Sequence, residues 1–85
     1  MRTEEFIEFV EDNYLGVSAK KSALGVVCYF REECSDGRIF ATNRHFATLE
    51  IVMAYHPEEI FGRTIERIQE TLQDSVDAHE ASLGD

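Results

Sequence analysis

The apolar residues between Pro57 and Val76 recur at helical spacing, and the same pattern continues more weakly as far as Leu83. At 100° per residue, the large apolar side chains fall on one side of such a helix: Phe61, Ile65, Ile68, Leu72 and Val76. Acidic residues occupy the opposite side, so one face must be buried while the other stays in water. We therefore predict one long C-terminal helix that starts at Pro57, and the rest of the chain has to cover its apolar face.

A second amphipathic helix is predicted over residues 3–15. Thr3 is a favourable capping residue, Glu4 and Glu5 suit the positive end of the helix dipole, and Gly16 can end the helix in a left-handed conformation. One side of this helix is apolar and holds Phe6, Ile7, Phe9, Val10 and Tyr14. Both ends of the sequence are therefore expected to be helices that each bury one face.

The middle of the chain has the composition of β-structure. Residues 24–30 are rich in β-branched and aromatic side chains and predict a strand, although residues 18–34 also place apolar side chains at helical spacing. Asp36-Gly37 predicts a hairpin into residues 38–42, because Asp bonds its own backbone and Gly adopts positive φ without strain. The small polar residues 18–22 are interpreted as a connection.

Residues 45–55 fit two structures. Alternating apolar positions and the pair Ile51-Val52 favour a strand, whereas helical spacing is the alternative. We accordingly predict an α+β fold of two layers, with an N-terminal helix, an antiparallel β-meander of two or three strands and a long C-terminal helix. These elements are expected to form one compact domain over residues 1–85, in the order α-β-β-β-α, or α-β-β-α-α if residues 45–55 are helical.

The first of these orders resembles that of double-stranded RNA-binding domains. The resemblance is limited to element order, because the basic helix start that such domains use is replaced here by the acidic segment Pro57-Glu58-Glu59. No direct binding of nucleic acid is therefore expected.

The chain of 85 residues has a net charge of −9, and its acids are concentrated at the two ends. Residues 1–15 carry −4, residues 16–56 carry +1 and residues 57–85 carry −6. Such a surface repels nucleic acid and anionic lipid and attracts basic molecules. With 44% hydrophobic residues and no apolar run near the roughly 18 residues of a membrane span, we expect a soluble, cytoplasmic protein.

No spacing typical of a catalytic, metal or nucleotide site is present. Cys28 and Cys34 are too far apart for a disulfide on either a strand or a helix, and they lack the spacing of a zinc motif. His45, His56 and His79 form no zinc-protease pair, and the glycines form no phosphate-binding loop. We therefore expect two free thiols, no cofactor, no metal and no catalytic residue.

The function that this pattern favours is non-enzymatic binding of a basic protein through the acidic side of the last helix. The residues predicted to bind are Glu59, Glu66, Glu70, Asp74 and Asp77. Acids at this spacing are loosely similar to a row of phosphates. The partner is therefore expected to be a nuclease or another nucleic-acid-handling protein whose groove this chain occupies as an inhibitor, the logic of small phage inhibitors of host nucleases.

Two other hypotheses belong to different classes. The first alternative is a homodimeric structural or assembly protein joined through the last helix. From Pro57 to Val76 this helix spans roughly 30 Å, about the width of a domain of this size, so its end is expected to overhang the sheet and to place Val76, His79 and Leu83 against another chain. The third hypothesis is a small enzyme or ligand-binding domain that uses Cys34 with His45, or Tyr55.

Overall fold

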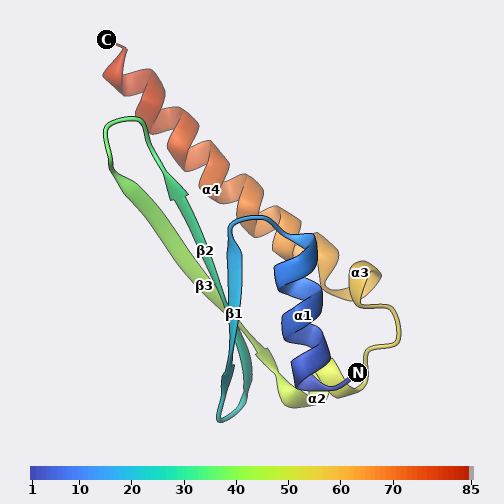
Figure 1. Ribbon diagram of the computed structural model, residues 1–85. Helices are drawn as coiled ribbons and strands as arrows, with labels where there is room; N and C mark the ends of the chain where they lie inside the picture. Colours follow the sequence, from blue (N-terminus) through green and yellow to red (C-terminus); the bar gives the residue numbers. More distant parts are fainter. Residues whose placement is uncertain (85) are drawn as a thin grey trace.

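The computed structural model describes residues 1–84, which form four helices and a three-stranded antiparallel sheet (Figure 1). The elements are α1 (Thr3–Asn13), β1 (Val17–Ser22), β2 (Gly25–Glu33), β3 (Ile39–Ala47), α2 (Thr48–Val52), α3 (Pro57–Ile60) and α4 (Gly62–Leu83). This confirms the predicted α+β fold, with an N-terminal helix, an antiparallel meander and a long C-terminal helix.

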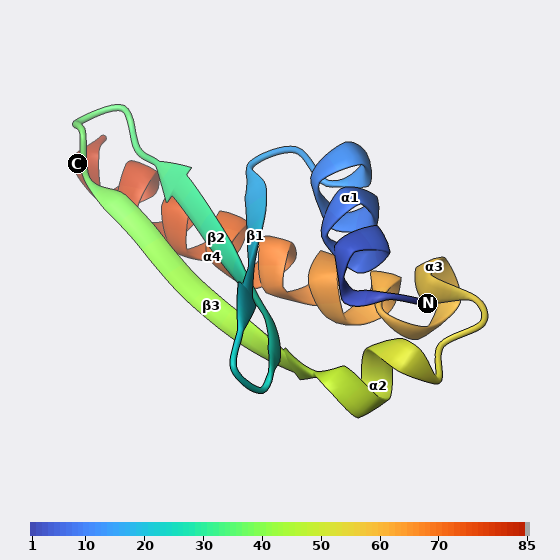
Figure 2. The same ribbon diagram turned by 60° about the horizontal axis from the view of Figure 1, so that its bottom comes forward.

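The two long helices cover one face of the sheet and leave the other face open (Figures 1 and 2). The strands follow one another in the order β1-β2-β3, so that Val17 pairs with Phe30 across the first ladder and Val26 pairs with Phe46 across the second. These four side chains are buried, whereas Tyr29, on the opposite face of β2, is 42% exposed. The apolar side of every strand therefore faces α1 and α4.

Strand β1 occupies the segment that its small polar residues had led us to interpret as a connection. Val17 and Ala19 are buried and alternate with exposed Ser18 and Lys20, a strand pattern too short and too polar to be recognised alone. Its stability comes from pairing with β2 and from α1, whose Glu11 carboxylate accepts a hydrogen bond of 3.4 Å from the outward N–H of Ala19. The interpretation of residues 18–22 as a loop was wrong because tertiary contacts outweigh local propensity.

Residues 45–55 combine the two structures that their sequence allowed. Strand β3 continues to Ala47, and helix α2 begins at Thr48, so the preferred strand is wrong beyond Ala47. The change of direction is fixed by Glu50, whose carboxylate accepts a hydrogen bond of 2.9 Å from the N–H of Ala47. Ile51 is the α2 side chain that reaches the core.

The predicted C-terminal helix does begin at Pro57, but it is interrupted at Phe61, which separates α3 from α4. The interruption lets Phe61 enter the core while Gly62 approaches Tyr14, whose hydroxyl would lie 3.0 Å from a Cβ at position 62. Beyond it the predicted apolar stripe is confirmed: Ile65, Leu72 and Val76 are buried and Ile68 is half-buried.

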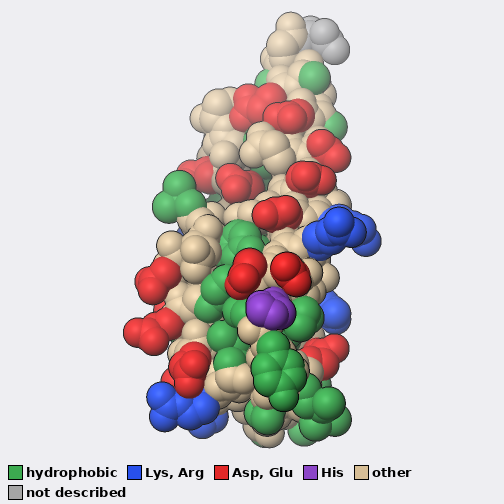
Figure 3. Space-filling view, turned by 90° about the vertical axis from the view of Figure 1, so that its right-hand side faces the viewer, with side chains coloured by type: hydrophobic (Ala, Val, Ile, Leu, Met, Phe, Trp, Pro, Cys, Tyr) green, Lys and Arg blue, Asp and Glu red, His purple; other side chains and the backbone are tan. Residues whose placement is uncertain are grey.

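The molecule is elongated, 49 × 24 × 18 Å (Figure 3), because the β2–β3 hairpin extends alongside α4 (Figure 1). At the tip of the hairpin, Ser35 hydrogen-bonds Glu80 and Asp36 contacts His79. The expected overhang of the last helix is therefore wrong for most of its length. Val76 is only 8% exposed within the single chain, whereas Leu83 is 47% exposed.

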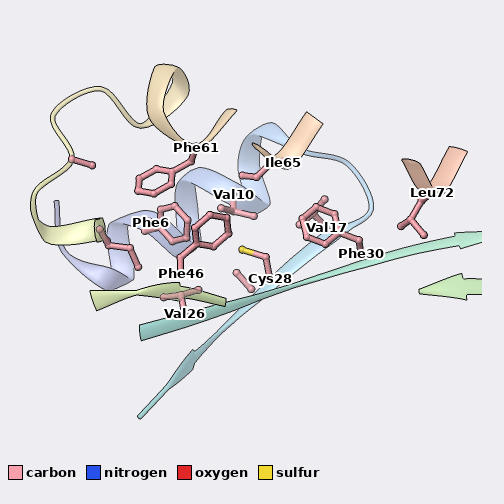
Figure 4. Packing of buried hydrophobic residues seen from close by; sticks show 13 residues of the cluster. Phe6, Val10, Val17, Val26, Cys28, Phe30, Phe46, Phe61, Ile65 and Leu72 are labelled. Atoms are coloured by element: carbon pink, nitrogen blue, oxygen red, sulfur yellow. The ribbon is translucent and has the colours of Figure 1, made fainter. Parts of the chain in front are cut away.

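Three phenylalanine rings form the centre of the core (Figure 4). Phe6 of α1 packs edge-to-face on Phe46 of β3 and on Phe61, with ring centroids 5.3 and 4.8 Å apart, and Phe46 meets Phe61 at 5.4 Å. This geometry is the favoured one for aromatic pairs, and it joins three segments distant in sequence.

No helix within residues 1–84 has the length and apolar character needed to cross a bilayer.

Gly25 provides a sharp test of this arrangement, because it pairs with Ala47 of β3 and the backbone around Ala47 leaves no space for a side chain at position 25. A Cβ at Gly25 would overlap the carbonyl oxygen of Phe46 and approach the backbone nitrogen of Thr48 to 2.8 Å. We expect Gly25→Ala to lower the free energy of unfolding by more than about 3 kcal/mol, since a backbone clash cannot be relieved by a rotamer change.

Gly37 is the matched control for Gly25 in urea denaturation. It also has positive φ, 89°, but no atom lies within 4 Å of the position that a Cβ would take there. Gly37→Ala should therefore cost only the roughly 1–2 kcal/mol of a left-handed alanine. Equal losses of stability in the two variants would show that the end of β3 does not pack against Gly25 as described.

Candidate functional site

The polar surface of α4 divides into two flanks of different chemistry, one on each side of the buried stripe. The flank toward α1 and the open end of β2 forms a shallow groove lined by Glu32, Glu66, Gln69, Glu70 and Gln73. Gln69 holds this flank of α4 next to the end of α1, because its side-chain amide donates a hydrogen bond of 3.3 Å to the carbonyl of Leu15. We call Glu32, Glu66, Glu70 and Asp77 the acidic flank.

The residues predicted to bind a partner are all exposed, but they do not lie on one helix. Glu66, Glu70, Asp74 and Asp77 belong to α4, whereas Glu59 belongs to α3, on the far side of the interruption at Phe61. Asp77 also accepts a hydrogen bond of 2.9 Å from Gln73 within the helix. The structure thus brings four of the five predicted side chains together on α4 and separates Glu59 from them.

The fold adds charges to this region that the helical pattern alone did not reveal. Glu32 reaches it from β2, and Tyr14 lies at its edge with a raised pKa, caused mainly by burial and further by the charges of Glu66 and Glu58. Glu32 is more than thirty residues away from Glu66 in sequence. Only the packing of the hairpin along α4 identifies it as part of the acidic flank.

Within residues 62–83, the opposite flank of α4 carries no acid. Two grooves next to β3 are bordered on α4 by Thr64, Arg67, Ile68 and Thr71. The groove at Thr64 also contains two charged side chains, Arg44 of β3 and Glu50 of α2. Strand β3 itself, with the sequence IFATNRHFA, contains no Asp or Glu. We call this acid-free surface of β3 and α4 the β3 side, and it is unusual in a chain of net charge −9.

Exposed apolar residues are concentrated at one end of the molecule, on α2, α3 and the segment between them. Figure 3 shows apolar side chains gathered at its lower end, while Asp and Glu side chains dominate higher up. The exposed members are Leu49, Val52, Met53, Tyr55 and Ile60.

Tyr55 is 90% exposed and no cleft encloses it, so it forms no ligand pocket of the kind required by the third hypothesis.

Cys34 and His45 do not meet, so the nucleophile pair of that hypothesis is not formed. Cys34 directly follows β2 at the tip of the hairpin, whereas His45 lies about 20 Å along β3 from the start of that strand. The Nε2 atom of His45 instead lies 3.2 Å from the hydroxyl of Ser22. The pair was suggested by residue type, a thiol with an imidazole as its base, and nothing in the spacing of the two residues required it.

The actual neighbours of Cys34 come from the hairpin turn and from α4. Asp36 Oδ2 is 2.8 Å from His79 Nε2, and this hydrogen bond is the main reason that the pKa of Asp36 is lowered. Ser35 donates from its backbone N–H and from its hydroxyl to the two carboxylate oxygens of Glu80, both at 2.6 Å, which lowers the pKa of Glu80. These contacts hold the hairpin tip on the last turns of α4, and no sequence motif indicated them.

No model of a known protein family matches the chain, and no curated protein or solved structure matches it either. We therefore infer function from the charges and contacts of the chain itself.

The environments of the two cysteines predict how they react. Both thiols are free and buried; burial raises the pKa of Cys28 to about 11 and also raises that of Cys34, with further contributions from nearby acids. Because the thiolate is the reactive form, native protein at pH 8 should be alkylated by iodoacetamide slowly at Cys34 and more slowly still at Cys28.

Mass spectrometry after timed alkylation measures the two rates, and alkylation in denaturant under non-reducing conditions should modify both residues rapidly. Rapid modification of Cys28 in the native protein would contradict its burial in the core, and failure to modify the two cysteines in denaturant would contradict their being free thiols.

Proposed function

We propose that this chain is a small non-enzymatic binding module that holds a basic protein on the acidic flank of α4. The observation that supports this proposal is the segregation of charge around one helix. Acids placed only for solubility would be useful on every exposed surface, yet the β3 side has none on its strand and none on its flank of α4.

The acids of this surface are available to a partner. Among the described residues, the ion pairs join Arg2 to Glu5, Lys21 to Glu4 and His79 to Asp36. Neither the acidic flank nor Asp74 takes part in any of them. Unpaired carboxylates grouped on a rigid helix produce a field that attracts a basic surface and accelerates its association.

The proposal extends to a partner whose basic groove binds nucleic acid. Along the axis of α4, Glu70 follows Glu66 by about 6 Å and Asp77 follows Glu70 by about 10.5 Å. A straight row of negative charges on one side of a narrow molecule is the feature that a groove for a phosphate backbone recognises. Occupation of such a groove would make the chain an inhibitor of a nuclease or a similar protein.

The test compares a charge reversal on the acidic flank with an equal reversal elsewhere. Glu66→Lys/Glu70→Lys changes the net charge by four units on the acidic flank. Glu8→Lys/Glu33→Lys makes the same change at two exposed positions outside it. Each immobilised protein is used to capture proteins from a lysate of the source cells, and captured proteins are identified by mass spectrometry and released with salt.

We expect a basic protein to be captured by the wild type and by the control variant but not by the acidic-flank variant. The complex should dissociate as the salt concentration rises from about 0.05 to 0.5 M, because exposed charges are then screened over a few ångströms. Purified with the wild type, that protein should lose its nucleic-acid-cleaving or nucleic-acid-binding activity. Capture that is identical for all three proteins would contradict the proposal.

The alternative, a homodimer, is favoured by the free edge of β3. The β2–β3 ladder has one hydrogen bond just beyond each of its ends. At the turn, the N–H of Cys34 donates to the carbonyl of Arg38, and at the other end the N–H of Thr48 donates to the carbonyl of Leu24. By the alternation of antiparallel pairing, the N–H and C=O groups of Ile39, Ala41, Asn43 and His45 then point away from β2. These are the groups that pair with another strand at a sheet edge.

A second copy is the occupant that suits this edge, because neither β3 nor the neighbouring flank of α4 brings an acid into such a contact, although Glu50 of α2 lines one of the adjoining grooves. Antiparallel pairing of two β3 strands about a two-fold axis would join the sheets. Thr64, Ile68 and Thr71 of the two α4 helices would then face each other across the grooves. Both acidic flanks would remain exposed on the outside.

Proline substitutions at the two sheet edges test this dimer. Ala41→Pro removes an outward N–H from β3, and Lys21→Pro removes one from β1 without touching the β3 side. In analytical ultracentrifugation we expect wild type and Lys21→Pro to sediment as dimers and Ala41→Pro as a monomer. A wild-type protein that is monomeric at about 100 μM, a concentration that detects even weak association, would exclude this alternative.

A further inference from the structure

We propose that Cys34, Asp36 and His79 form a binding site for a divalent transition-metal ion, and that Zn²⁺ is the ion that this set of ligands suits best. One ligand atom from each residue, the thiol sulfur, a carboxylate oxygen and an imidazole nitrogen, lies within 4.8 Å of the other two. The proposal concerns the end of the molecule away from the aromatic core and does not depend on the binding of a basic protein.

The distances are close to those of a metal site. Around tetrahedral Zn²⁺, with bonds of about 2.0–2.3 Å, the ligand atoms lie roughly 3.3–3.7 Å from one another. Asp36 Oδ2 and His79 Nε2 are 2.8 Å apart, joined by a hydrogen bond. An ion would have to separate these two atoms slightly and draw the sulfur inward by about an ångström, movements that side-chain rotation can supply.

The turn already orients Asp36 toward the site. Its Oδ1 atom accepts a hydrogen bond of 3.1 Å from the N–H of Arg38, which leaves Oδ2 to face His79. The N–H of Gly37 donates to the carbonyl of Cys34 at 3.0 Å, so Cys34 and Asp36 are carried by the same tight turn. Two of the three ligands are thus held in place before any ion binds.

His79 and Glu80 complete the arrangement from the other side. The His79 ring packs edge-on against Phe40, with centroids 6.0 Å apart, and is 16% exposed. Glu80 uses both carboxylate oxygens to accept hydrogen bonds from Ser35. It therefore serves as a positioning residue that fixes the turn against α4, as the outer hydrogen bonds of metal sites commonly do.

The chemistry of the three ligands selects the class of ion. A sulfur, an imidazole nitrogen and a carboxylate oxygen together suit Zn²⁺, whereas Ca²⁺ and Mg²⁺ take oxygen ligands only. Binding forms a Zn–S bond and releases the thiol proton of Cys34 to solvent, without any change of oxidation state. Three protein ligands leave the fourth tetrahedral position for water or for a group from another molecule.

An ion here would join residues 34 and 79, which are distant in sequence, and so would stabilise the end of the molecule that has the fewest buried side chains. From the sequence we expected no metal, because Cys34, Asp36 and His79 match no zinc motif. The elongated hairpin is what brings them together.

The test is titration of the whole chain, purified without metal, with ZnCl₂ and separately with CoCl₂. We expect one Zn²⁺ per chain by isothermal titration calorimetry, with release of a proton, and a higher thermal unfolding midpoint. Co²⁺ should give the thiolate charge-transfer band and the intense visible bands of a tetrahedral site.

Cys34→Ser, Asp36→Asn and His79→Gln should each weaken Zn²⁺ binding at least about tenfold, the scale on which even supporting residues matter. His45→Gln removes a histidine from a position remote from the site and should bind like the wild type. Alkylation of the wild type provides a readout that requires no variant to fold: Zn²⁺ should slow modification of Cys34 and leave Cys28 unchanged.

The proposal is overturned if the wild type binds no Zn²⁺ at about 100 μM, far above the dissociation constants of structural zinc sites. Binding that persists unchanged in both Cys34→Ser and His79→Gln, or that fails to protect Cys34, would overturn it equally. Loss of binding in His45→Gln would place the metal elsewhere.

Discussion

The contact between the apolar stripe of α4 and the β2–β3 hairpin is the interaction on which the rest of the structure depends. The apolar face of a sheet has to be buried against another element, and α4 covers the β2–β3 part of it through Ile65, Leu72 and Val76, while α1 covers β1. Burying each of these side chains contributes about 1.5–3 kcal/mol. The aromatic contact of Phe6, Phe46 and Phe61 then fixes α1 and α3 around the same end of the sheet.

The same packing determines how charge is distributed. Once the stripe faces the sheet, every other position of α4 is assigned to a flank, and the acids fall toward α1 while threonine, arginine and isoleucine fall toward β3. A rotation of α4 by one residue, about 100°, would exchange buried and exposed positions and destroy this separation. The proposed binding surface and the acid-free edge are therefore two results of one helix orientation.

The parts of the fold that were predictable from sequence are those whose periodicity is strong and local. The stripe of α4, the arc of α1 and the turn at Asp36-Gly37 each carry a physical signal within a few residues. Strand β1 was missed because only Val17 and Ala19 of its six residues face the core, and its stability comes from partners elsewhere. The interruption at Phe61 was missed because the helical pattern continues through it, whereas the burial of Phe61 and the approach of Gly62 to Tyr14 depend on segments distant in sequence.

The candidate site was predictable to a similar extent. Four acids of α4 follow from the helical pattern, whereas Glu32 and the group of Cys34, Asp36 and His79 depend on residues that are close in space and distant in sequence. Spacing rules detect metal ligands when they lie on one element or in one short motif. They cannot detect ligands divided between a hairpin turn and a helix, because the length of the hairpin sets the distance and no short segment encodes it.

The elongated hairpin has a consequence for how the native state fluctuates. Cys34 and Val76 are buried but lie outside the continuous core. Few apolar contacts therefore join the tip of the β2–β3 hairpin to the last turns of α4. The hydrogen bonds of Ser35 and Asp36 make the rest of this connection. Segments of this kind open separately from the global transition, with free energies well below that of complete unfolding. We therefore expect the hairpin tip and the last turns of α4 to open at a lower free energy than the aromatic end, while the rest of the chain remains folded.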